Sequence, residues 1–135
     1  MSRIAALIVA CFATAQPATA DGVWSGTWRQ TGSKQTELRT IDRGVDIEFQ
    51  LEIWGGPPAY ASGGMEGHLS INQGKAAYET TEFEGKCRIE FTFTPRRVVV
   101  KQVMGDWAAC GFGHSIIADG TFVRVSRKNP KFVRH

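Results

Sequence analysis

The sequence lacks the segments and motifs by which several large protein classes are recognised. It has no apolar run of eighteen residues, which argues against a transmembrane helix. It also has no Walker A loop, no HExxH and no CxxC motif, so common signatures of nucleotide-dependent enzymes, zinc peptidases and thiol oxidoreductases are missing. Charged residues are 21% and hydrophobic residues 42% of the 135-residue chain, a composition that excludes a disordered protein. The length fits a single domain.

The first twenty residues have the order of a secretory signal peptide. A basic start, Met1–Arg3, precedes the uncharged apolar segment Ile4–Ala15, and Ala18-Thr19-Ala20 forms a small-residue cleavage site. We therefore expect a signal peptide at residues 1–20 and a periplasmic or secreted mature protein. One alternative is a short buried N-terminal helix. Another is a lipid anchor, because Ile8-Val9-Ala10-Cys11 resembles a lipoprotein-processing box.

Two cysteines, Cys87 and Cys110, remain after cleavage. An even number of cysteines in an exported protein predicts a disulfide. The bridge would stabilise the fold by about 3 kcal/mol in the chain-entropy description. The alternative is a pair of buried free thiols.

Hydrophobic residues recur with a period of two along most of the remaining chain. Ile47–Ile53 and Arg88–Thr94 alternate apolar and polar residues, which predicts strands with one buried and one solvated face. No segment has a sustained period of 3.6. Weaker alternation predicts further strands at Val23–Gln30, Thr36–Ile41, Met65–Ile71, Lys75–Thr81, Val98–Met104, Phe112–Ala118 and Thr121–Ser126.

Turn-forming residues separate these segments. Asp119-Gly120 predicts a type I′ hairpin between the last two strands. Asp42-Arg43-Gly44 and Asn72-Gln73-Gly74 each predict a turn with glycine in the left-handed conformation, and Pro95-Arg96-Arg97 breaks another pair. The predicted fold is all-β: a small antiparallel meander of about eight strands over residues 21–126, closed or nearly closed into a lipocalin-like barrel with one disulfide. A basic C-terminal tail follows at residues 127–135.

The first predicted strand carries two G-x-W steps, Gly22-Val23-Trp24 and Gly26-Thr27-Trp28. They resemble the opening strand of lipocalin-like barrels. The resemblance implies that a tryptophan closes one end of the barrel and that Arg124 or Arg127 packs over it in a cation–π contact. It also raises the alternative of a small-ligand carrier. A filled interior is favoured instead by the large residues expected to point inward: Phe49, Leu51, Ile89, Phe91 and Phe93.

The segment Trp54–Gly64 is not strand-like and offers the best candidate binding residues: Trp54, Tyr60, Ser62 and Gly63. Aromatic side chains on a stiff glycine- and proline-containing loop are typical of recognition hot spots. The alternative is a connection whose aromatic residues fold back onto the core.

The polar residues do not predict catalysis. His114 and Ser115 are neighbours on a predicted strand and would point to opposite faces. Glu66, His68 and His114 form at most an incomplete metal site. Only Glu66 and His68 share a predicted strand face, whereas zinc takes three or four ligands. Three carboxylates are expected to be solvated: Glu79, Glu82 and Glu84. We expect no catalytic residues, no metal and no cofactor.

Segments of the second half resemble a group of small exported bacterial β-barrel proteins of unsettled function. The shared segments are Met65–Leu69, Lys75–Tyr78 and the cysteine-led strand Cys87–Phe93. The most distinctive is the ending C-G-F-G…A-D-G-T-[YF], here Cys110–Gly113 and Ala118–Phe122.

The layout is also similar, at the level of the fold, to periplasmic lysozyme inhibitors. Those are small disulfide-bearing barrels that insert a Ser/Gly/Tyr-containing loop into the lysozyme cleft, and the resemblance implies such a part for Tyr60, Ser62 and Gly63. In the inhibitors serine precedes tyrosine, whereas here Tyr60 precedes Ser62.

We therefore expect an exported non-enzymatic binding module, whose partner is an extracytoplasmic protein such as a cell-wall hydrolase, or a cell-wall component. The alternatives are the small-ligand carrier and, less favoured, a hydrolase or metal-binding protein. A nucleic-acid partner is not expected, because no strand interleaves basic and aromatic residues. The sequence does not define the oligomeric state.

The net charge of +3 is divided unevenly along the chain. Residues 124–135 hold five basic and no acidic residues, whereas residues 21–123 hold ten basic and thirteen acidic ones. This division predicts an acidic barrel with a basic end. An acidic surface would steer a cationic partner such as a lysozyme, and a free basic tail would rest on an anionic membrane or wall polymer.

Overall fold

The computed structural model describes residues 22–33 and 35–133, so the predicted signal peptide at residues 1–20, with Cys11, lies outside the described residues. Within the described part the chain forms eight antiparallel strands and no helix, and so none that could cross a membrane. This confirms the predicted all-β fold. The strands are β1 (Gly26–Gln30), β2 (Glu37–Asp42), β3 (Ile47–Trp54), β4 (Ser62–Leu69), β5 (Lys75–Thr80), β6 (Cys87–Phe93), β7 (Arg97–Met104) and β8 (Gly120–Ser126).

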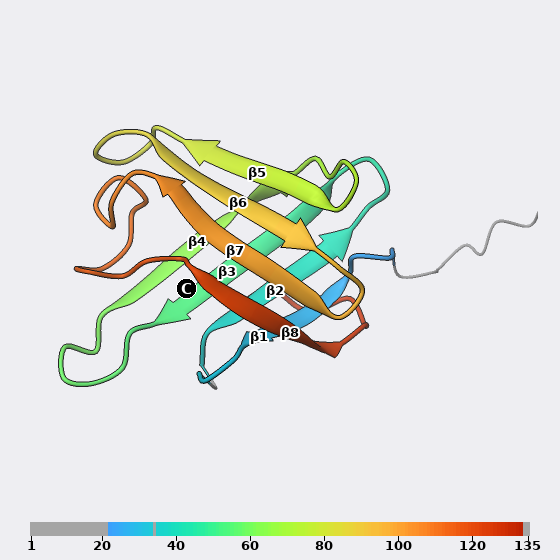
Figure 1. The fold of residues 1–135 in the computed structure, drawn as a ribbon, viewed down its shortest axis with the longest axis horizontal. Helices are drawn as coiled ribbons and strands as arrows, with labels where there is room; N and C mark the ends of the chain where they lie inside the picture. Colours follow the sequence, from blue (N-terminus) through green and yellow to red (C-terminus); the bar gives the residue numbers. More distant parts are fainter. Residues whose placement is uncertain (1–21, 34, 134–135) are drawn as a thin grey trace, which may run out of the picture.

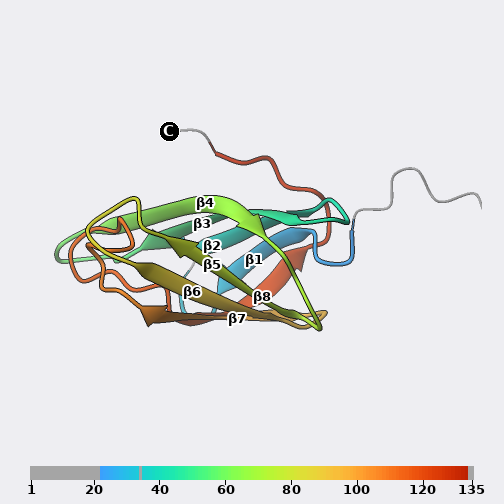
Figure 2. The same cartoon turned by 90° about the horizontal axis from the view of Figure 1, so that it is seen from above.

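The strands form one sheet that curls into a nearly closed barrel (Figure 1). Successive strands pair with each other except β4 and β5, and the first strand pairs with the last. Figure 2 shows β2 to β4 in one layer and β5 to β7 in the other, with β1 and β8 joining them. Short turns at residues 43–46, 70–74 and 94–96 define one end of the barrel, the short-turn end. Loops at residues 31–36, 55–61, 81–86 and 105–119 define the other, the long-loop end.

Side chains close the seam where β4 and β5 do not pair. The ring of Tyr78 on β5 lies against Gly67 on β4, where a Cβ would be 2.5 Å from the Tyr78 ring. The Tyr78 ring also packs edge-on against Phe49, with ring centroids 5.2 Å apart. The absence of a side chain at position 67 therefore makes room for the ring that covers the seam.

Aromatic rings fill the barrel interior. Phe49 and Phe91 are buried with ring centroids 5.2 Å apart, and Phe93 stacks on Phe91 at 6.3 Å and meets Trp28 at 5.9 Å. Leu51 and Ile89 are fully buried beside them. The residues predicted to point inward are thus buried in the core of the barrel.

Trp28 and Arg124 hold the short-turn end together. The Arg124 guanidinium lies 4.6 Å from the centroid of the Trp28 ring, which confirms the predicted cation–π contact for Arg124. The same guanidinium donates hydrogen bonds to the carbonyls of Val23 and Ser25. The pKa of Arg124 is lowered, mainly because the side chain is partly buried and to a smaller extent because the positive charge of Arg127 is nearby.

Two of the predicted turns are confirmed, and the predicted last hairpin is wrong. Gly44 and Gly74 have φ angles of 85° and 77°. Residues 105–119, however, form one long loop without a strand at Phe112–Ala118. The reason is that Gln102 on β7 binds this loop in place of a partner strand: its side-chain oxygen accepts from Ala118 N at 2.9 Å, and its backbone N–H donates to the Asp119 carboxylate at 2.7 Å.

The described part of the basic tail, residues 127–133, folds back over the outer side of the β2–β4 layer (Figure 2). Val133 N donates to the side-chain oxygen of Gln50 on β3 at 2.9 Å. Gln50 in turn donates to the Val133 carbonyl and to Glu66 at 2.6 Å. Although Gln50 is an outward-facing residue of β3, the tail leaves it only 2% exposed.

Candidate binding surface at the long-loop end

The loop that joins β3 to β4, residues 55–61, is internally hydrogen-bonded. Gly55 N donates to the carbonyl of Ala61 at 2.8 Å, and Tyr60 N donates to the carbonyl of Gly56 at 2.9 Å. Gly56 and Tyr60 both have positive φ angles, of 68° and 51°. Glycine adopts a positive φ angle without steric cost. At Tyr60 a positive φ angle is uncommon, and the hydrogen bonds of the loop stabilise it.

This loop presents two aromatic side chains to solvent. Trp54, the last residue of β3, is 41% exposed, and Tyr60 is 61% exposed. Their ring centroids lie 6.2 Å apart, so the two rings form one patch. The alternative that the loop folds its aromatic residues back onto the core is therefore wrong for Trp54 and Tyr60.

Ser62 and Gly63 lie in β4 and not in the loop, which corrects the expectation that residues 54–64 contain no strand. β4 begins early because Ser62 pairs with Trp54 and Gly63 with Ile53. A Cβ at Gly63 would be 2.7 Å from the Phe112 ring, and the Ser62 carbonyl accepts a hydrogen bond from Gly113 N at 2.8 Å. The backbone of these two residues thus fixes the loop 105–119 against the barrel, while the Ser62 side chain remains exposed.

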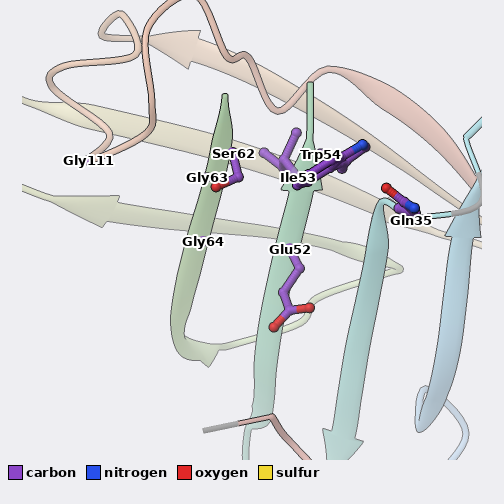
Figure 3. A pocket seen from close by; sticks show the side chains of 8 residues that line it. All are labelled: Gln35, Glu52, Ile53, Trp54, Ser62, Gly63, Gly64 and Gly111. Atoms are coloured by element: carbon purple, nitrogen blue, oxygen red, sulfur yellow. The ribbon is translucent and has the colours of Figure 1, made fainter. Parts of the chain in front are cut away.

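Three of the four predicted binding residues line one hollow of about 410 Å³: Trp54, Ser62 and Gly63. Gln35, Glu52, Ile53, Gly64 and Gly111 complete its lining. Figure 3 shows the Trp54 ring extending from the end of β3 towards Gln35, with Ser62 on β4 and Gly111 on the loop beyond it. Tyr60 is not part of this lining but stands beside it through its contact with Trp54.

A third exposed aromatic residue lies at this end and was not predicted from the sequence. Phe83, in the β5–β6 loop, is 48% exposed. Its ring lies against Gly111, where a Cβ would be 2.6 Å from it, and Gly111 also lines the hollow beside Trp54. The sequence feature that could have indicated it is an aromatic residue between two glutamates, Glu82-Phe83-Glu84. We call Trp54, Tyr60 and Phe83 the aromatic surface.

The predicted disulfide fixes the loop behind this surface. Cys87 at the start of β6 is bonded to Cys110, with 5.0 Å between their Cα atoms. Both cysteines are fully buried. Gly111, on which Phe83 packs, directly follows the bridge, so the bond limits the movement of this part of the aromatic surface.

Acidic side chains border the aromatic surface. Glu82 and Glu84 flank Phe83, are exposed, and form no ion pair among the described residues. Glu52 on the lining of the hollow lies 3.3 Å from Arg39. Glu79 accepts a hydrogen bond from Arg88 at 2.7 Å, which lowers the pKa of this exposed carboxyl group.

The other candidate groups are separated. His68 at the end of β4 lies 2.8 Å from Asp46 in a short turn, whereas His114 packs on Trp107 in the loop 105–119, with ring centroids 4.7 Å apart. In the part of the chain that the structure describes, no three His, Cys, Asp or Glu side chains are placed to hold a metal ion. Ser115 has a φ of 62° in the same loop, so the two-faced strand expected for His114 and Ser115 is absent.

The chain is a nearly closed antiparallel barrel in which exposed aromatic residues and a disulfide lie at the same end. Comparison of the chain with known protein families, with curated proteins and with solved structures found no match.

Proposed function

We propose that the protein is an exported, non-enzymatic binding module that recognises an extracytoplasmic protein through the aromatic surface. The observation that carries the proposal is the exposure of Trp54, Tyr60 and Phe83, at 41%, 61% and 48%, at an end of the barrel that is held by strand pairing, loop hydrogen bonds and a disulfide. Rigid aromatic side chains bury a large area on binding and lose little conformational entropy, so they contribute much of the affinity of protein interfaces.

The proposed partner is a cationic cell-wall hydrolase of the lysozyme kind. Two features support this choice. Glu82 and Glu84, which form no ion pair within the described part of the chain, place negative charge beside Phe83, and this favours encounter with a basic protein. The hollow beside Trp54 also offers a recess next to the exposed Tyr60 ring, so the surface has both a projecting and a receiving part.

The test is inhibition of a lysozyme and direct binding to it, with the mature protein and single alanine variants. Trp54→Ala and Tyr60→Ala should each weaken binding about tenfold or more, since hot-spot aromatic residues contribute roughly 1.4 kcal/mol or more. Val45→Ala is the matched control, because Val45 is 89% exposed but lies at the short-turn end. Equal affinity of all variants, or no binding by the unaltered protein, would contradict the proposal.

A further inference from the structure

A second surface lies at the opposite end of the barrel, where the fold gathers basic residues from distant parts of the chain. Arg96 and Arg97 come from the β6–β7 turn and the start of β7, and Arg127 and Lys128 follow β8. The pairing of β7 with β8 brings them together: Arg97 is opposite Val123, and Arg124 N donates to the carbonyl of Arg96 at 2.9 Å. We call Arg96, Arg97, Arg127 and Lys128 the arginine corner.

The charges of the arginine corner are not compensated within the described residues. All four side chains are exposed, and none of them forms an ion pair there. Other basic residues of the barrel are paired with carboxylates: Arg29, Arg39, Arg43, Lys86 and Arg88. Several basic residues elsewhere are thus neutralised, whereas the arginine corner gathers four exposed cations that form no ion pair among the described residues, which creates a local positive potential.

Exposed apolar side chains lie between these arginines. Val123 and Val125, on the outer face of β8, are 37% and 50% exposed. Together with Arg96 and Arg127 they line a hollow of about 340 Å³. Positive charge mixed with exposed aliphatic side chains suits a partner that is both anionic and apolar within a few ångströms of its surface.

We propose that the arginine corner docks the protein onto the surface of a bilayer that contains anionic phospholipids. The guanidinium groups of Arg96 and Arg127 would bind lipid phosphates, which match their planar donor geometry, while Val123 and Val125 contact the apolar boundary below the headgroups. A soluble polyanion would satisfy the arginines but would offer nothing to the two valines. The surface is separate from the aromatic surface, so docking and the proposed recognition of a protein partner are independent.

The experiment measures sedimentation of the mature protein with phosphatidylcholine vesicles, with and without phosphatidylglycerol, at low salt. Binding is expected only with the anionic vesicles. Arg96→Ser/Arg127→Ser should lower the partition coefficient on the order of 30-fold, since each basic residue near such a surface contributes roughly a factor of five. Lys75→Ser/Lys101→Ser is the matched control. Like the arginines, these two lysines form no ion pair among the described residues. They lie outside the arginine corner, where they line a different hollow over β5 to β7. It should change binding by much less.

A second variant separates a bilayer from a soluble polyanion. Val123→Ser/Val125→Ser keeps every charge and should lower vesicle binding while leaving binding to polyphosphate unchanged. Unchanged vesicle binding by this variant would overturn the bilayer assignment in favour of general polyanion attraction. Failure of the unaltered protein to bind anionic vesicles, or equal losses in the arginine and lysine variants, would overturn the proposal itself. Thermal unfolding of each variant confirms that it is folded.

Discussion

Two glycines of β4 allow a direct test of how the barrel is closed. Gly67 and Gly64 lie three residues apart in the same strand, and neither requires a positive φ angle. A Cβ at Gly67 would be 2.5 Å from the Tyr78 ring, whereas a Cβ at Gly64 would meet only the Leu51 carbonyl oxygen at 3.9 Å. Alanine at the two positions therefore makes the same chemical change in two different environments.

We expect opposite effects on the free energy of unfolding. Gly64→Ala should be neutral or stabilise the protein by up to about 1 kcal/mol, because glycine within a strand costs roughly that much conformational entropy. Gly67→Ala should destabilise it by about 1–3 kcal/mol, the usual range for overpacking. The cost arises because Tyr78 cannot give way freely: its ring also packs on Phe49, and its movement would open the seam between β4 and β5.

The measurement is the unfolding midpoint in denaturant and the melting temperature of both variants. For a domain of this size, 1 kcal/mol corresponds to about 4 °C, so the two variants should differ by roughly 5–15 °C. Near-ultraviolet circular dichroism should report the displaced Tyr78 ring in the Gly67 variant alone. Equal stability of the two variants would refute the conclusion that Tyr78 closes the seam by packing on Gly67.

Three further predictions concern stability. Replacing both Cys87 and Cys110 by alanine should cost about 3 kcal/mol, measured by denaturant unfolding against the reduced unaltered protein, which should be equally destabilised. Arg124→Lys should lower the melting temperature by several degrees, since lysine cannot reproduce the guanidinium's hydrogen bonds to Val23 and Ser25; an unchanged value would contradict this. The pKa of Glu79 is lowered in the folded protein, so its ionised form stabilises the fold at pH values above the unfolded pKa. This stabilisation is lost as the pH falls through the folded pKa. Glu79→Gln should therefore reduce the loss of unfolding free energy on acidification.

The strands were predictable because burial on one face alone imposes a period of two. In β6, alternate residues are buried as they alternate in the sequence, and β3 follows the same rule except at Gln50, which the tail covers on the outer face. The same rule failed at residues 112–118, where apolar Phe112, Ile116 and Ala118 are buried by a loop that covers the barrel end. The course of this loop depends on the disulfide and on hydrogen bonds between Gln102 and residues 118 and 119, which are long-range contacts that no local pattern reveals.

The candidate sites were predictable only where one segment contains them. Trp54 and Tyr60 share a glycine- and proline-containing segment, so both were found from the sequence. Phe83 lies in a separate acidic turn and joins them only through its packing on Gly111. The arginine corner combines Arg96 and Arg127, about thirty residues apart, because β7 and β8 pair. The sequence predicted a basic end from the tail alone.

The distribution of charge links the two proposed surfaces. Exposed aromatic residues lie at the long-loop end together with Glu82 and Glu84, whereas the arginine corner lies at the short-turn end. None of these charged side chains forms an ion pair among the described residues. A barrel polarised in this way would be oriented by an anionic bilayer, because the bilayer attracts one end and repels the other. The aromatic surface would then face away from the lipid, towards the space where a cell-wall hydrolase acts. If recognition and docking are both confirmed, protein bound to anionic vesicles should still bind its partner with undiminished affinity, since neither surface covers the other.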